Sequence, residues 1–459
     1  MSRIKTQTVS SMTEGSIWKG MLQFFLPIML GTLLQQLYST VDSIILGRFV
    51  GKAALGAVGG SNTAIINLLV NFFVGLSSGA SVIIAQHYGA HNDDAVRRSV
   101  YTAMALSVAI GAFLTVVGIS LASTLLTALD TPDDLMQYSL DYLRWYFAGM
   151  IPSMIYNMGS GVLRAVGDSK RPLFFLAVCT LVNTLLDLLF VAVFRMEVKG
   201  AAIATSLAQL VCAVLVLYTL RRRNDCCRLV LRRDGFDRAL LGRMLAIGLP
   251  AGIQTTLYSI TNVFVQIAVN SLGSDTVAAW SAFWKLDGVF WPISGAIGIA
   301  VMTFVGQNYG AHKPERIYAG IRTGAILHFS FSVVYAALLY LGRAPVLRLF
   351  CTDDAVVREG ASIVRYVFLG YLAVFPSEVY SAAMRGVGNA VKPTLLTLFG
   401  ICVLRMVLLY TVTFPNTSNL TVAILYPITW ASSSLLFVIY YRFGKWMPSY
   451  GKSSVQEER

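Results

Sequence analysis

The chain has 459 residues, of which 56% are hydrophobic and 13% are charged, with a formal net charge of +13. A soluble domain carries roughly 25% charged residues, so this composition excludes an ordinary soluble protein and indicates a membrane protein. The longest polar interval, residues 221–238, is too short for a separate soluble domain.

Twelve apolar stretches follow one another along the chain, and each is long enough for a membrane-spanning helix of about 20 residues. They lie at residues 18–46, 54–84, 100–127, 138–163, 172–194, 200–220, 240–270, 276–305, 317–342, 361–384, 394–414 and 421–443. No short apolar run near the N-terminus leads to a small-residue cleavage site, so we expect no removable signal peptide. The pattern predicts an all-α polytopic membrane protein with twelve transmembrane helices.

Lysine and arginine residues are distributed unevenly between successive loops. When the N-terminus is placed inside, most of the 36 basic residues fall in the inner loops and few in the outer ones. Basic residues accumulate on the cytoplasmic side of membrane proteins. The distribution therefore predicts a multi-pass protein of the cell (inner or plasma) membrane with cytoplasmic N- and C-termini. It also accounts for the positive net charge without a nucleic-acid partner, and we expect none.

The two halves of the chain repeat each other. Gln-His-Tyr-Gly-Ala-His at 86–91 returns as Gln-Asn-Tyr-Gly-Ala-His at 307–312. With the same spacing, Arg-Ala-Val-Gly-Asp-Ser-Lys-Arg-Pro at 164–172 returns as Arg-Gly-Val-Gly-Asn-Ala-Val-Lys-Pro at 385–393. Six helices are an even number, so both halves share one orientation. We therefore predict two six-helix lobes related by a pseudo-twofold axis along the membrane normal, with the substrate path between them.

These boundaries predict four parts of the chain. Residues 1–220 form an N-lobe of six helices, 221–239 a basic cytoplasmic linker, 240–443 a C-lobe of six helices, and 444–459 a cytoplasmic tail. We interpret the linker as a solvated tether that also sets the topology, with binding of anionic lipid as a second possibility. Cys226 and Cys227 lie in this loop and are the cysteine pair most open to oxidation or acylation.

Two acids lie inside predicted membrane helices. Asp42 interrupts the first stretch and Asp187 the fifth, and a charged carboxylate near the bilayer centre costs about 2.5–3.5 kcal/mol. Asn183 precedes Asp187 by four residues, so both face one side of a helix. Thr205, on the next helix, is expected at similar depth. These oxygens would suit a small hard cation, or two carboxylates would hold a proton between them. The alternative is two unrelated polar residues satisfied by neighbouring helices.

The acids break the symmetry of the repeat. With the repeat spacing, Asn183 corresponds to Leu404 and Asp187 to Leu408, while Asp42 corresponds to Asn262 or Val263. Only the first half therefore has the acidic cluster. A fold does not need such a cluster twice, whereas a coupling ion needs it once. We take this asymmetry as an indication of function.

Charged residues also interrupt predicted helices of the second half, among them Lys285, Asp287 and Glu378. We interpret them as candidate residues of a substrate cavity, in which a charge would meet a cationic drug or a proton. Neighbouring aromatic rings could wall a planar cation; they belong to Trp280, Phe283, Trp284, Phe290 and Trp291. The alternative is a buried ion-pair network that fixes helix packing, with Arg405 as one partner.

Pro27 lies in the middle of the first predicted helix, where a proline removes a backbone hydrogen bond and permits a kink. It precedes Asp42 by fifteen residues, and Asn183-x3-Asp187 and Thr205 follow. This order, with the segments Ala-Gln-His-Tyr-Gly-Ala and Leu-Arg-Ala-Val-Gly-Asp-Ser, resembles the multidrug and toxic compound extrusion (MATE) family. The resemblance covers nearly the whole chain.

The resemblance implies secondary active efflux of cationic or amphipathic compounds in antiport with Na⁺ or H⁺. In the family, the positions matching Asp42, Asn183, Asp187 and Thr205 form the cation or proton site of the N-lobe. Some members carry a further acid on the seventh helix, where this chain has Ser259. A second coupling site is therefore expected to be absent or altered.

The expected protein is a transporter and not an enzyme. We expect no catalytic residues, no cofactor and no metal other than Na⁺ at the coupling site, since the same oxygens serve Na⁺ or H⁺. Its expected partners are small-molecule drugs or toxic organic cations and the lipid bilayer, and we expect a monomer. The alternative function is a flippase for a lipid-linked or amphiphilic precursor that uses the same two-lobed fold.

Overall fold

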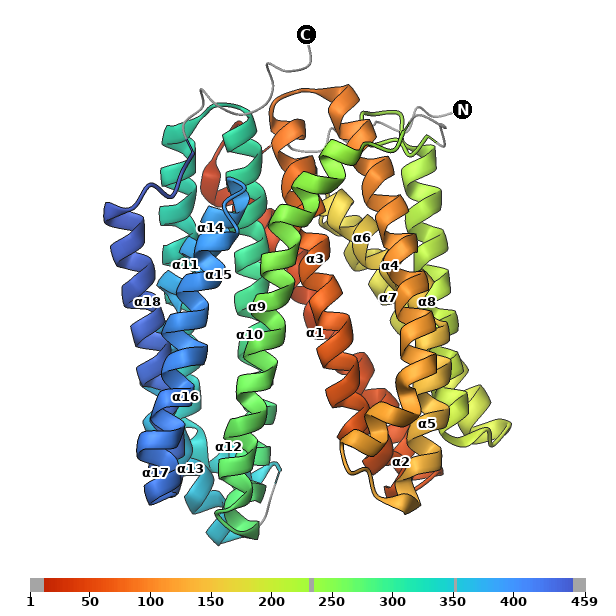
Figure 1. Cartoon of the computed structure of the whole chain (residues 1–459), viewed down its shortest axis with the longest axis vertical. Helices are drawn as coiled ribbons and strands as arrows, with labels where there is room; N and C mark the ends of the chain where they lie inside the picture. Colours follow the sequence, from red (N-terminus) through yellow and green to blue (C-terminus); the bar gives the residue numbers. More distant parts are fainter. Residues whose placement is uncertain (1–11, 231–234, 351–352, 449–459) are drawn as a thin grey trace. The chain divides into compact units, whose positions relative to one another are not determined.

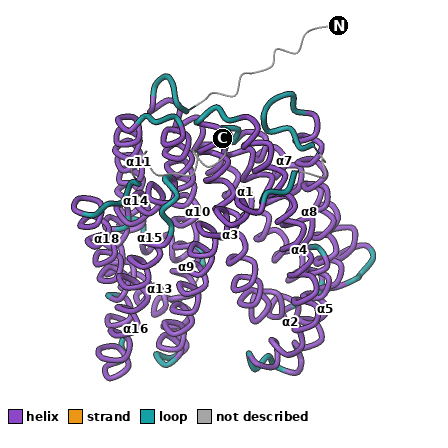
Figure 2. The backbone as a smooth tube through the Cα atoms, turned by 45° about the horizontal axis from the view of Figure 1, so that its top comes forward, coloured by secondary structure: helices purple, strands orange, loops and turns teal. Residues whose placement is uncertain are grey.

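The structure, a computed structural model, describes residues 12–230, 235–350 and 353–448. Within these residues it consists of helices joined by loops and contains no strand (Figure 1, Figure 2). The all-α prediction is therefore confirmed.

The chain divides into two compact units. The first contains Leu22–Gly252 and the second Ile253–Arg459, while the short segment Gly15–Met21 belongs to the second. The predicted linker 221–239 thus falls within the first unit. The first helix of each half is therefore divided between the two units. The chain passes from the first unit to the second within such a helix, and not in its polar loop.

The first half of the chain forms six helical rods. They are α1 (Ile17–Phe49); α2 (Lys52–Ala57), η1 (Val58–Asn62) and α3 (Thr63–Gly89); α4 (Asp93–Ala128); α5 (Asp133–Ala148) and α6 (Met150–Ala165); α7 (Lys170–Asp187) and η2 (Leu188–Val193); and α8 (Glu197–Arg222). Both η1 and η2 are π-helical turns.

The second half forms six further rods. They are α9 (Arg238–Asn270); α10 (Ser274–Gly310); α11 (Pro314–Leu341), followed by the short α12 (Arg343–Arg348); α13 (Asp354–Ala373) and α14 (Phe375–Gly386); α15 (Val391–Thr397), η3 (Leu398–Val403), α16 (Leu404–Leu408), η4 (Leu409–Thr413) and η5 (Phe414–Asn416); and α17 (Asn419–Ala423) and α18 (Leu425–Phe443). The twelve rods of the described residues match the twelve predicted stretches.

Ten of these rods are long and apolar enough to cross a membrane by their length and composition. The other two are α5–α6, which is interrupted at Gly149, and α9, which carries the polar run Gln-Thr-Thr at 254–256. Breaks in a membrane-spanning helix are tolerated where other parts of the protein cover them.

The outward faces of the helices are apolar. On α7, Phe174, Leu181 and Leu185 are more than half exposed, whereas Asn183 and Asp187 on the same helix are buried. An apolar face turned outward and a polar face turned inward is the arrangement expected of a helix in lipid. The same arrangement brings the predicted functional side chains of α7 into the interior of the first unit.

Glycines allow α3 and the first part of α9 to cross closely. Gly75 and Gly79 on α3 meet Gly248 and Gly252 on α9, so each helix presents two glycines four residues apart. A Cβ atom added at Gly75 would lie 2.9 Å from the Cα atom of Gly252. Small residues at this spacing let membrane helices approach until their backbones touch. This crossing fixes the N-terminal part of α9 within the first unit.

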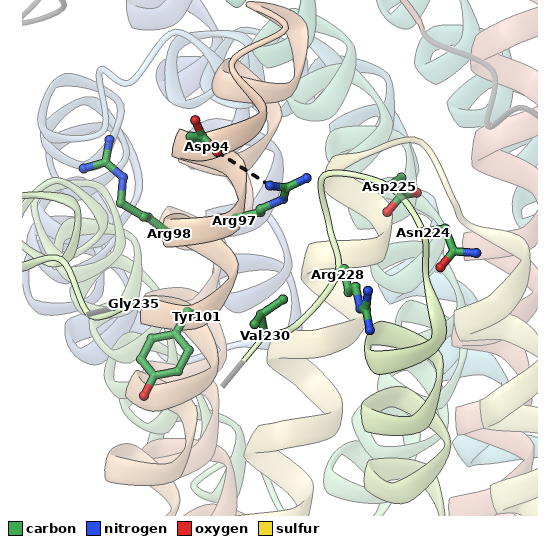
Figure 3. A pocket seen from close by; sticks show the side chains of 9 residues that line it. All are labelled: Asp94, Arg97, Arg98, Tyr101, Asn224, Asp225, Arg228, Val230 and Gly235. Atoms are coloured by element: carbon green, nitrogen blue, oxygen red, sulfur yellow. Dashed lines mark ion pairs between the residues drawn. The ribbon is translucent and has the colours of Figure 1, made fainter. Parts of the chain in front are cut away.

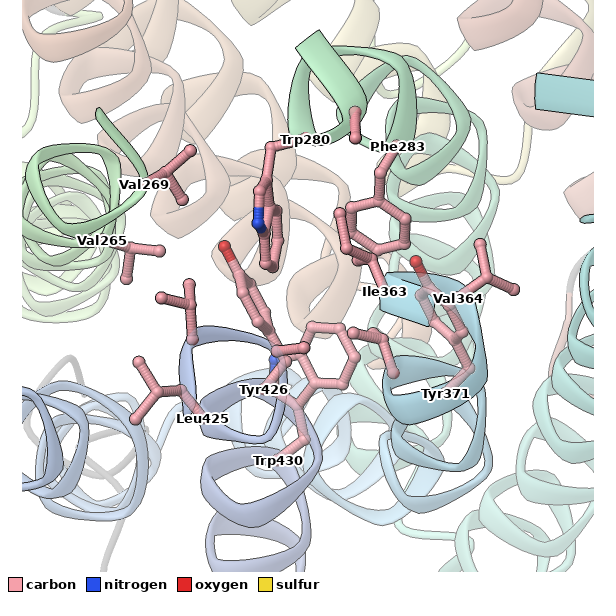
Figure 4. Close-up of a cluster of buried hydrophobic side chains, with 14 of the residues drawn as sticks. Val265, Val269, Trp280, Phe283, Ile363, Val364, Tyr371, Leu425, Tyr426 and Trp430 are labelled. Carbon is pink, nitrogen blue, oxygen red and sulfur yellow. The ribbon is translucent and has the colours of Figure 1, made fainter. Parts of the chain in front are cut away.

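Each unit has an apolar core of its own. One apolar cluster of the first unit gathers around Leu114, Leu143 and Phe147. The core of the second unit is rich in aromatic rings, including Trp280, Phe283, Tyr371, Tyr426 and Trp430 (Figure 4). These rings surround the polar groups that the second unit buries.

Candidate functional site

The four residues predicted to form the coupling site lie on three helices of the first unit. Asp42 lies on α1, Asn183 and Asp187 on α7, and Thr205 on α8. All four are buried, and the side chain of Asp187 has no exposed surface. These residues are up to 163 positions apart in the sequence, and the structure brings them together in the interior of one unit.

Asp42 and Asp187 are direct neighbours. Their carboxyl groups are close enough to interact, and the amide of Asn183 also reaches Asp187. None of these contacts satisfies the geometry of a normal hydrogen bond: one oxygen of Asp42, both oxygens of Asp187 and both polar atoms of Asn183 have no hydrogen-bond partner among the described residues. A buried polar group without a partner costs about 1–3 kcal/mol. The cluster is thus a set of oxygen atoms that need a positive charge or a proton.

Thr205 joins this cluster through a tyrosine. The hydroxyl group of Tyr38 donates a hydrogen bond to Oγ1 of Thr205 over 3.0 Å. Tyr38 lies one helical turn before Asp42 on α1, and it is close enough to both acids to interact with them electrostatically. Tyr38 therefore connects the threonine on α8 with the acids on α1 and α7.

A further tyrosine, Tyr142 of α5, borders the acids, and Tyr146 of the same helix packs against it. Tyr142 interacts electrostatically with both Asp42 and Asp187, and its ring stacks on that of Tyr146 with centroids 5.8 Å apart. The sequence analysis missed all three tyrosines. Tyr38 could have been found, because its spacing of four residues from Asp42 puts both on one helical face. Tyr142 and Tyr146 could not, since only tertiary packing brings α5 to this place.

The backbone next to Asp187 is unusual. The α-helical part of α7 ends at Asp187, and the π-helical turn η2 follows directly. Such turns are rare and occur often at functional sites. However, η4 follows Leu408 at the matching position of the second half. The π-helical turn thus belongs to the repeated fold, and only the acid in front of it is peculiar to the first half.

Pro27, the predicted kink residue, lies inside α1, and the helix continues through it. The matching proline, Pro250, lies inside α9 in the same way. Both prolines remove one backbone hydrogen bond from a helix that is divided between the two units. Their role as a bending point remains a prediction.

Asp287, one of the predicted cavity residues, lines a cavity of about 300 Å³ in the second unit. Its carboxylate accepts hydrogen bonds from the hydroxyl of Tyr371 over 2.6 Å and from Nε1 of Trp291 over 2.9 Å. The other lining residues are aromatic or carry amides, namely Tyr258, Asn262, Gln266, Trp284, Trp291 and Tyr426. The cavity thus combines one acid with aromatic walls.

The other two predicted cavity residues lie elsewhere. Glu378 lines a separate, smaller cavity of about 60 Å³ and interacts electrostatically with Arg385. Lys285 is exposed, and its ammonium group lies 5.6 Å from the ring centre of Phe350. The structure therefore does not bring Lys285, Asp287 and Glu378 together.

Arg405 is a fully buried cation near Asp287. It donates hydrogen bonds to Oδ1 of Asn262 over 2.9 Å and to Oγ1 of Thr429 over 3.2 Å. Its guanidinium also lies 4.8 Å from the ring centre of Tyr426, and it attracts the carboxylate of Asp287. In the repeat, Arg405 directly follows the position of Asn183, so the second half buries a cation where the first half buries acids.

Both halves of the repeat match the model of one known protein family. A model of the MatE family matches residues 27–189 and again residues 250–411. The chain belongs to the MatE family. The two matches begin at Pro27, the predicted helix breaker, and at Pro250, the matching proline of α9. The resemblance to MATE transporters and the internal duplication are therefore both confirmed.

Members of the MatE family with curated names cover almost the whole chain. The probable multidrug resistance protein YoeA of Bacillus subtilis is 29% identical over 439 residues, which are 94% of this chain and 95% of that protein. The probable multidrug resistance protein NorM of Thermotoga maritima is 26% identical over 85% of this chain and 84% of its own length. A FAD transporter of Shewanella oneidensis is 25% identical over 74% of this chain and 76% of its own.

Solved structures of MatE relatives share the fold. A MOP superfamily transporter from Pyrococcus furiosus has a TM-score of 0.89 at 23% identity and covers 95% of this chain and 98% of its own. A MATE multidrug resistance transporter in an outward-facing conformation has a TM-score of 0.88 at 22% identity, with 96% and 98% covered. The protein is thus a multi-span membrane transporter with the twelve-helix, two-lobe fold of this family.

Proposed function

We propose that the protein exports cationic or amphipathic organic compounds in exchange for Na⁺ or H⁺, by alternating access of its two halves. The observation that carries this proposal is the pair of buried carboxyl groups, Asp42 and Asp187, of which one oxygen of Asp42 and both oxygens of Asp187 have no hydrogen-bond partner among the described residues. Two neighbouring acids in a membrane interior are stable together only when a cation or a proton reduces their charge.

In this proposal the ion binds between α1, α7 and α8. Asp42 and Asp187 supply carboxylate oxygens, Asn183 supplies its amide oxygen, and Thr205 supplies its hydroxyl, which Tyr38 already orients. Small hard cations such as Na⁺ prefer oxygen ligands, and a shared proton would satisfy the same carboxyl groups. The ligand set therefore supports either ion equally.

Neutralisation of the acids would change the conformation that the first unit prefers. Asp42 lies on the same helix as Pro27, and a proline lowers the resistance of a helix to bending because one backbone hydrogen bond is missing. When the ion binds, the repulsion between α1 and α7 disappears, and α1 bends at Pro27 and expels the substrate. When the ion leaves on the inner side, α1 straightens and a new substrate binds.

We propose the cavity at Asp287 as the place where the second half holds a substrate. Asp287 is fixed by Tyr371 and Trp291, and the rings of Trp284 and Tyr426 line the same cavity. A carboxylate between aromatic faces attracts a flat organic cation by charge and by cation–π contact. Glu378, in its separate cavity, would meet only a substrate large enough to reach both, and the exposed Lys285 would touch neither.

Two other substrate classes compete with this proposal. The FAD transporter among the relatives is a specific reason to test an anionic dinucleotide. The buried Arg405 would be the residue to attract it, although its present partners, Asn262 and Thr429, would have to yield. A lipid-linked or amphiphilic precursor, moved by a flippase of the same fold, is the other alternative.

The test is transport by the purified protein in liposomes. Proteoliposomes are loaded with a cationic fluorescent dye, and export is followed after a Na⁺ gradient or a pH gradient is imposed. Wild type is compared with Asp42→Asn and Asp187→Asn, and with Asp94→Asn as the matched control, because Asp94 is an exposed acid of α4. We expect one gradient to drive export, both buried substitutions to abolish it, and the control to leave it unchanged.

Two outcomes would contradict the proposal. If transport survives in folded Asp42→Asn and Asp187→Asn proteins, the acids serve packing and not coupling. If neither gradient moves any of several dyes, the substrate class is wrong, and the same liposomes are then tested with FAD and with a fluorescent lipid-linked precursor.

A further inference from the structure

The described part of the linker is folded back on the first unit. The backbone N–H of Leu229 donates to the carbonyl oxygen of Leu220, the last turn of α8, over 3.0 Å. Within the loop, the N–H of Arg228 donates to the carbonyl oxygen of Asp225 over 3.1 Å. Residues 223–230 are therefore held against α8 and do not form the solvated tether that the sequence suggested.

Arg223 and Asp225 fix the start of this loop. Nε of Arg223 donates to both carboxylate oxygens of Asp225, over 3.0 and 2.8 Å, and Nη1 donates to Asp168 over 3.4 Å. Attraction from Arg223 outweighs the effect of burial, which by itself would raise the pKa of Asp225, and leaves that pKa lowered. Asp225 in turn accepts a hydrogen bond from the N–H of Cys227 over 3.1 Å.

The loop that Arg223 and Asp225 fix in this way holds two adjacent thiols side by side. The sulfur atoms of Cys226 and Cys227 lie 3.8 Å apart, and both cysteines are free. Cys226 is 7% exposed and Cys227 is fully buried. A disulfide has its sulfurs about 2.05 Å apart, so this pair is not joined. The distance between the two sulfur atoms leaves room for one heavy atom to bind to both of them.

A cavity lies beside the loop that carries the pair, and the residues that flank the two cysteines line it, whereas the cysteines do not. Its volume is about 880 Å³, and Asn224, Asp225 and Arg228 line one side of it. Figure 3 shows these linker residues facing Arg97 and Tyr101 of α4 across the cavity. Residues directly before and after the thiols thus border a space large enough for a small aromatic group.

The number of protein atoms that can bind a ligand decides which ligand the two thiols suit. Zn²⁺ in proteins takes four ligands as a rule, and the described residues contain no group of three or more His, Cys, Asp or Glu side chains that could hold a metal ion. Soft thiolates select soft partners. A monosubstituted trivalent arsenic atom needs two sulfur ligands and no more, because its third bond is already made to carbon.

We propose that Cys226 and Cys227 form a dithiol site for trivalent arsenic compounds. With an arylarsine oxide, two arsenic–sulfur bonds form and the arsenic–oxygen double bond breaks. The oxygen leaves as water with the two thiol protons, and arsenic remains trivalent, so no oxidant is required. Since the second bond closes a ring within the protein, the adduct is far more stable than one on a single thiol.

One other cysteine pair must be separated from this site. Cys179 on α7 and Cys212 on α8 are also neighbours, and both are buried inside membrane-spanning helices. The test therefore uses a variant in which Cys179, Cys212, Cys351 and Cys402 are all replaced by alanine. Only the linker pair remains in this protein.

The probe is phenylarsine oxide, and the readout is the mass of the intact protein. We expect the four-alanine variant to gain one phenylarsenic group that resists washing with a monothiol and is released by 2,3-dimercaptopropanol. Adding Cys226→Ser or Cys227→Ser should remove this monothiol-resistant adduct. The proposal is overturned if the folded four-alanine variant gains no adduct, or if the adduct survives either serine substitution.

A second comparison covers the case in which four substitutions prevent folding. The full chain is then compared with the Cys226→Ser/Cys227→Ser variant, in which all membrane cysteines remain. We expect one monothiol-resistant phenylarsenic group fewer in the variant, and a peptide that contains residues 226–227 should carry the group in the wild type. Equal numbers of groups in the two proteins would disprove the site.

Discussion

At the scale of residues, the two halves treat buried charge in opposite ways. The first half buries Asp42 and Asp187 together, and one oxygen of Asp42 and both oxygens of Asp187 have no hydrogen-bond partner among the described residues. The second half holds the partly buried Asp287, but it supplies two hydrogen-bond donors and the nearby cation Arg405. Only the first arrangement needs a positive charge from outside the protein. This difference is the physical reason for placing ion coupling in the first half.

Arg405 should therefore be a stabilising residue of the second unit. Arg405→Met removes the hydrogen bonds to Asn262 and Thr429 and the cation that attracts Asp287, and a hydrogen bond to a charged group contributes about 1.5–3 kcal/mol. We expect a clear fall in the melting temperature of the detergent-solubilised protein. Adding Asp287→Asn to Arg405→Met removes the unpaired charge and should restore part of the loss. An unchanged melting temperature in Arg405→Met, or no recovery in the double variant, would disprove the pairing.

At the scale of elements, α9 is the helix whose packing is most constrained. Its N-terminal part touches α3 through four glycines, and Pro250 lies between two of them in the sequence. The repeat explains the proline, because Pro27 occupies the matching position of α1. The glycine crossing is visible only when α3 and α9 are seen together, since neither helix shows by its own sequence which neighbour its glycines meet.

Two glycines of α9 provide a matched test of this crossing. A Cβ atom at Gly248 would lie 2.9 Å from the backbone carbonyl carbon of Leu76, whereas a Cβ atom at Gly242 would meet nothing within 4 Å. We expect Gly248→Ala to destabilise the protein by about 1–3 kcal/mol, because overpacking forces the backbones apart. Gly242→Ala should be neutral or stabilising by up to about 1 kcal/mol, because alanine is the better helix former. Thermal unfolding of both variants is the measurement, and equal effects would contradict close packing at Gly248.

At the scale of the whole molecule, the first helix of each half begins in the unit formed mainly by the other half. Gly15–Met21 of α1 belongs to the second unit, and the part of α9 up to Gly252 belongs to the first. Each of these two helices therefore contributes residues to both units.

The coupling proposed between the ion and the substrate must be reciprocal. If the ion lowers the affinity for a cationic dye, the dye must lower the affinity for the ion by the same factor, and typical coupling energies of about 1–3 kcal/mol correspond to roughly 5- to 150-fold. We expect the dissociation constant of the dye to rise on addition of Na⁺ or on acidification, whichever ion drives transport. In Asp187→Asn this dependence should disappear, while the dye still binds. A dye affinity that is independent of both ions in the wild type would exclude direct antagonism.

The sequence by itself determined the membrane class, the twelve helices and the duplication, because apolar length and repeated motifs are local properties of the chain. It also determined the candidate acids, since a carboxylate within an apolar stretch is conspicuous without any structure. Tertiary structure alone decided that Tyr142 borders these acids, that Arg405 attracts Asp287, and that Lys285 lines neither cavity. It also showed that residues 223–230 are held against α8. These facts depend on which helix faces lie together, and helical spacing within one segment does not contain that information.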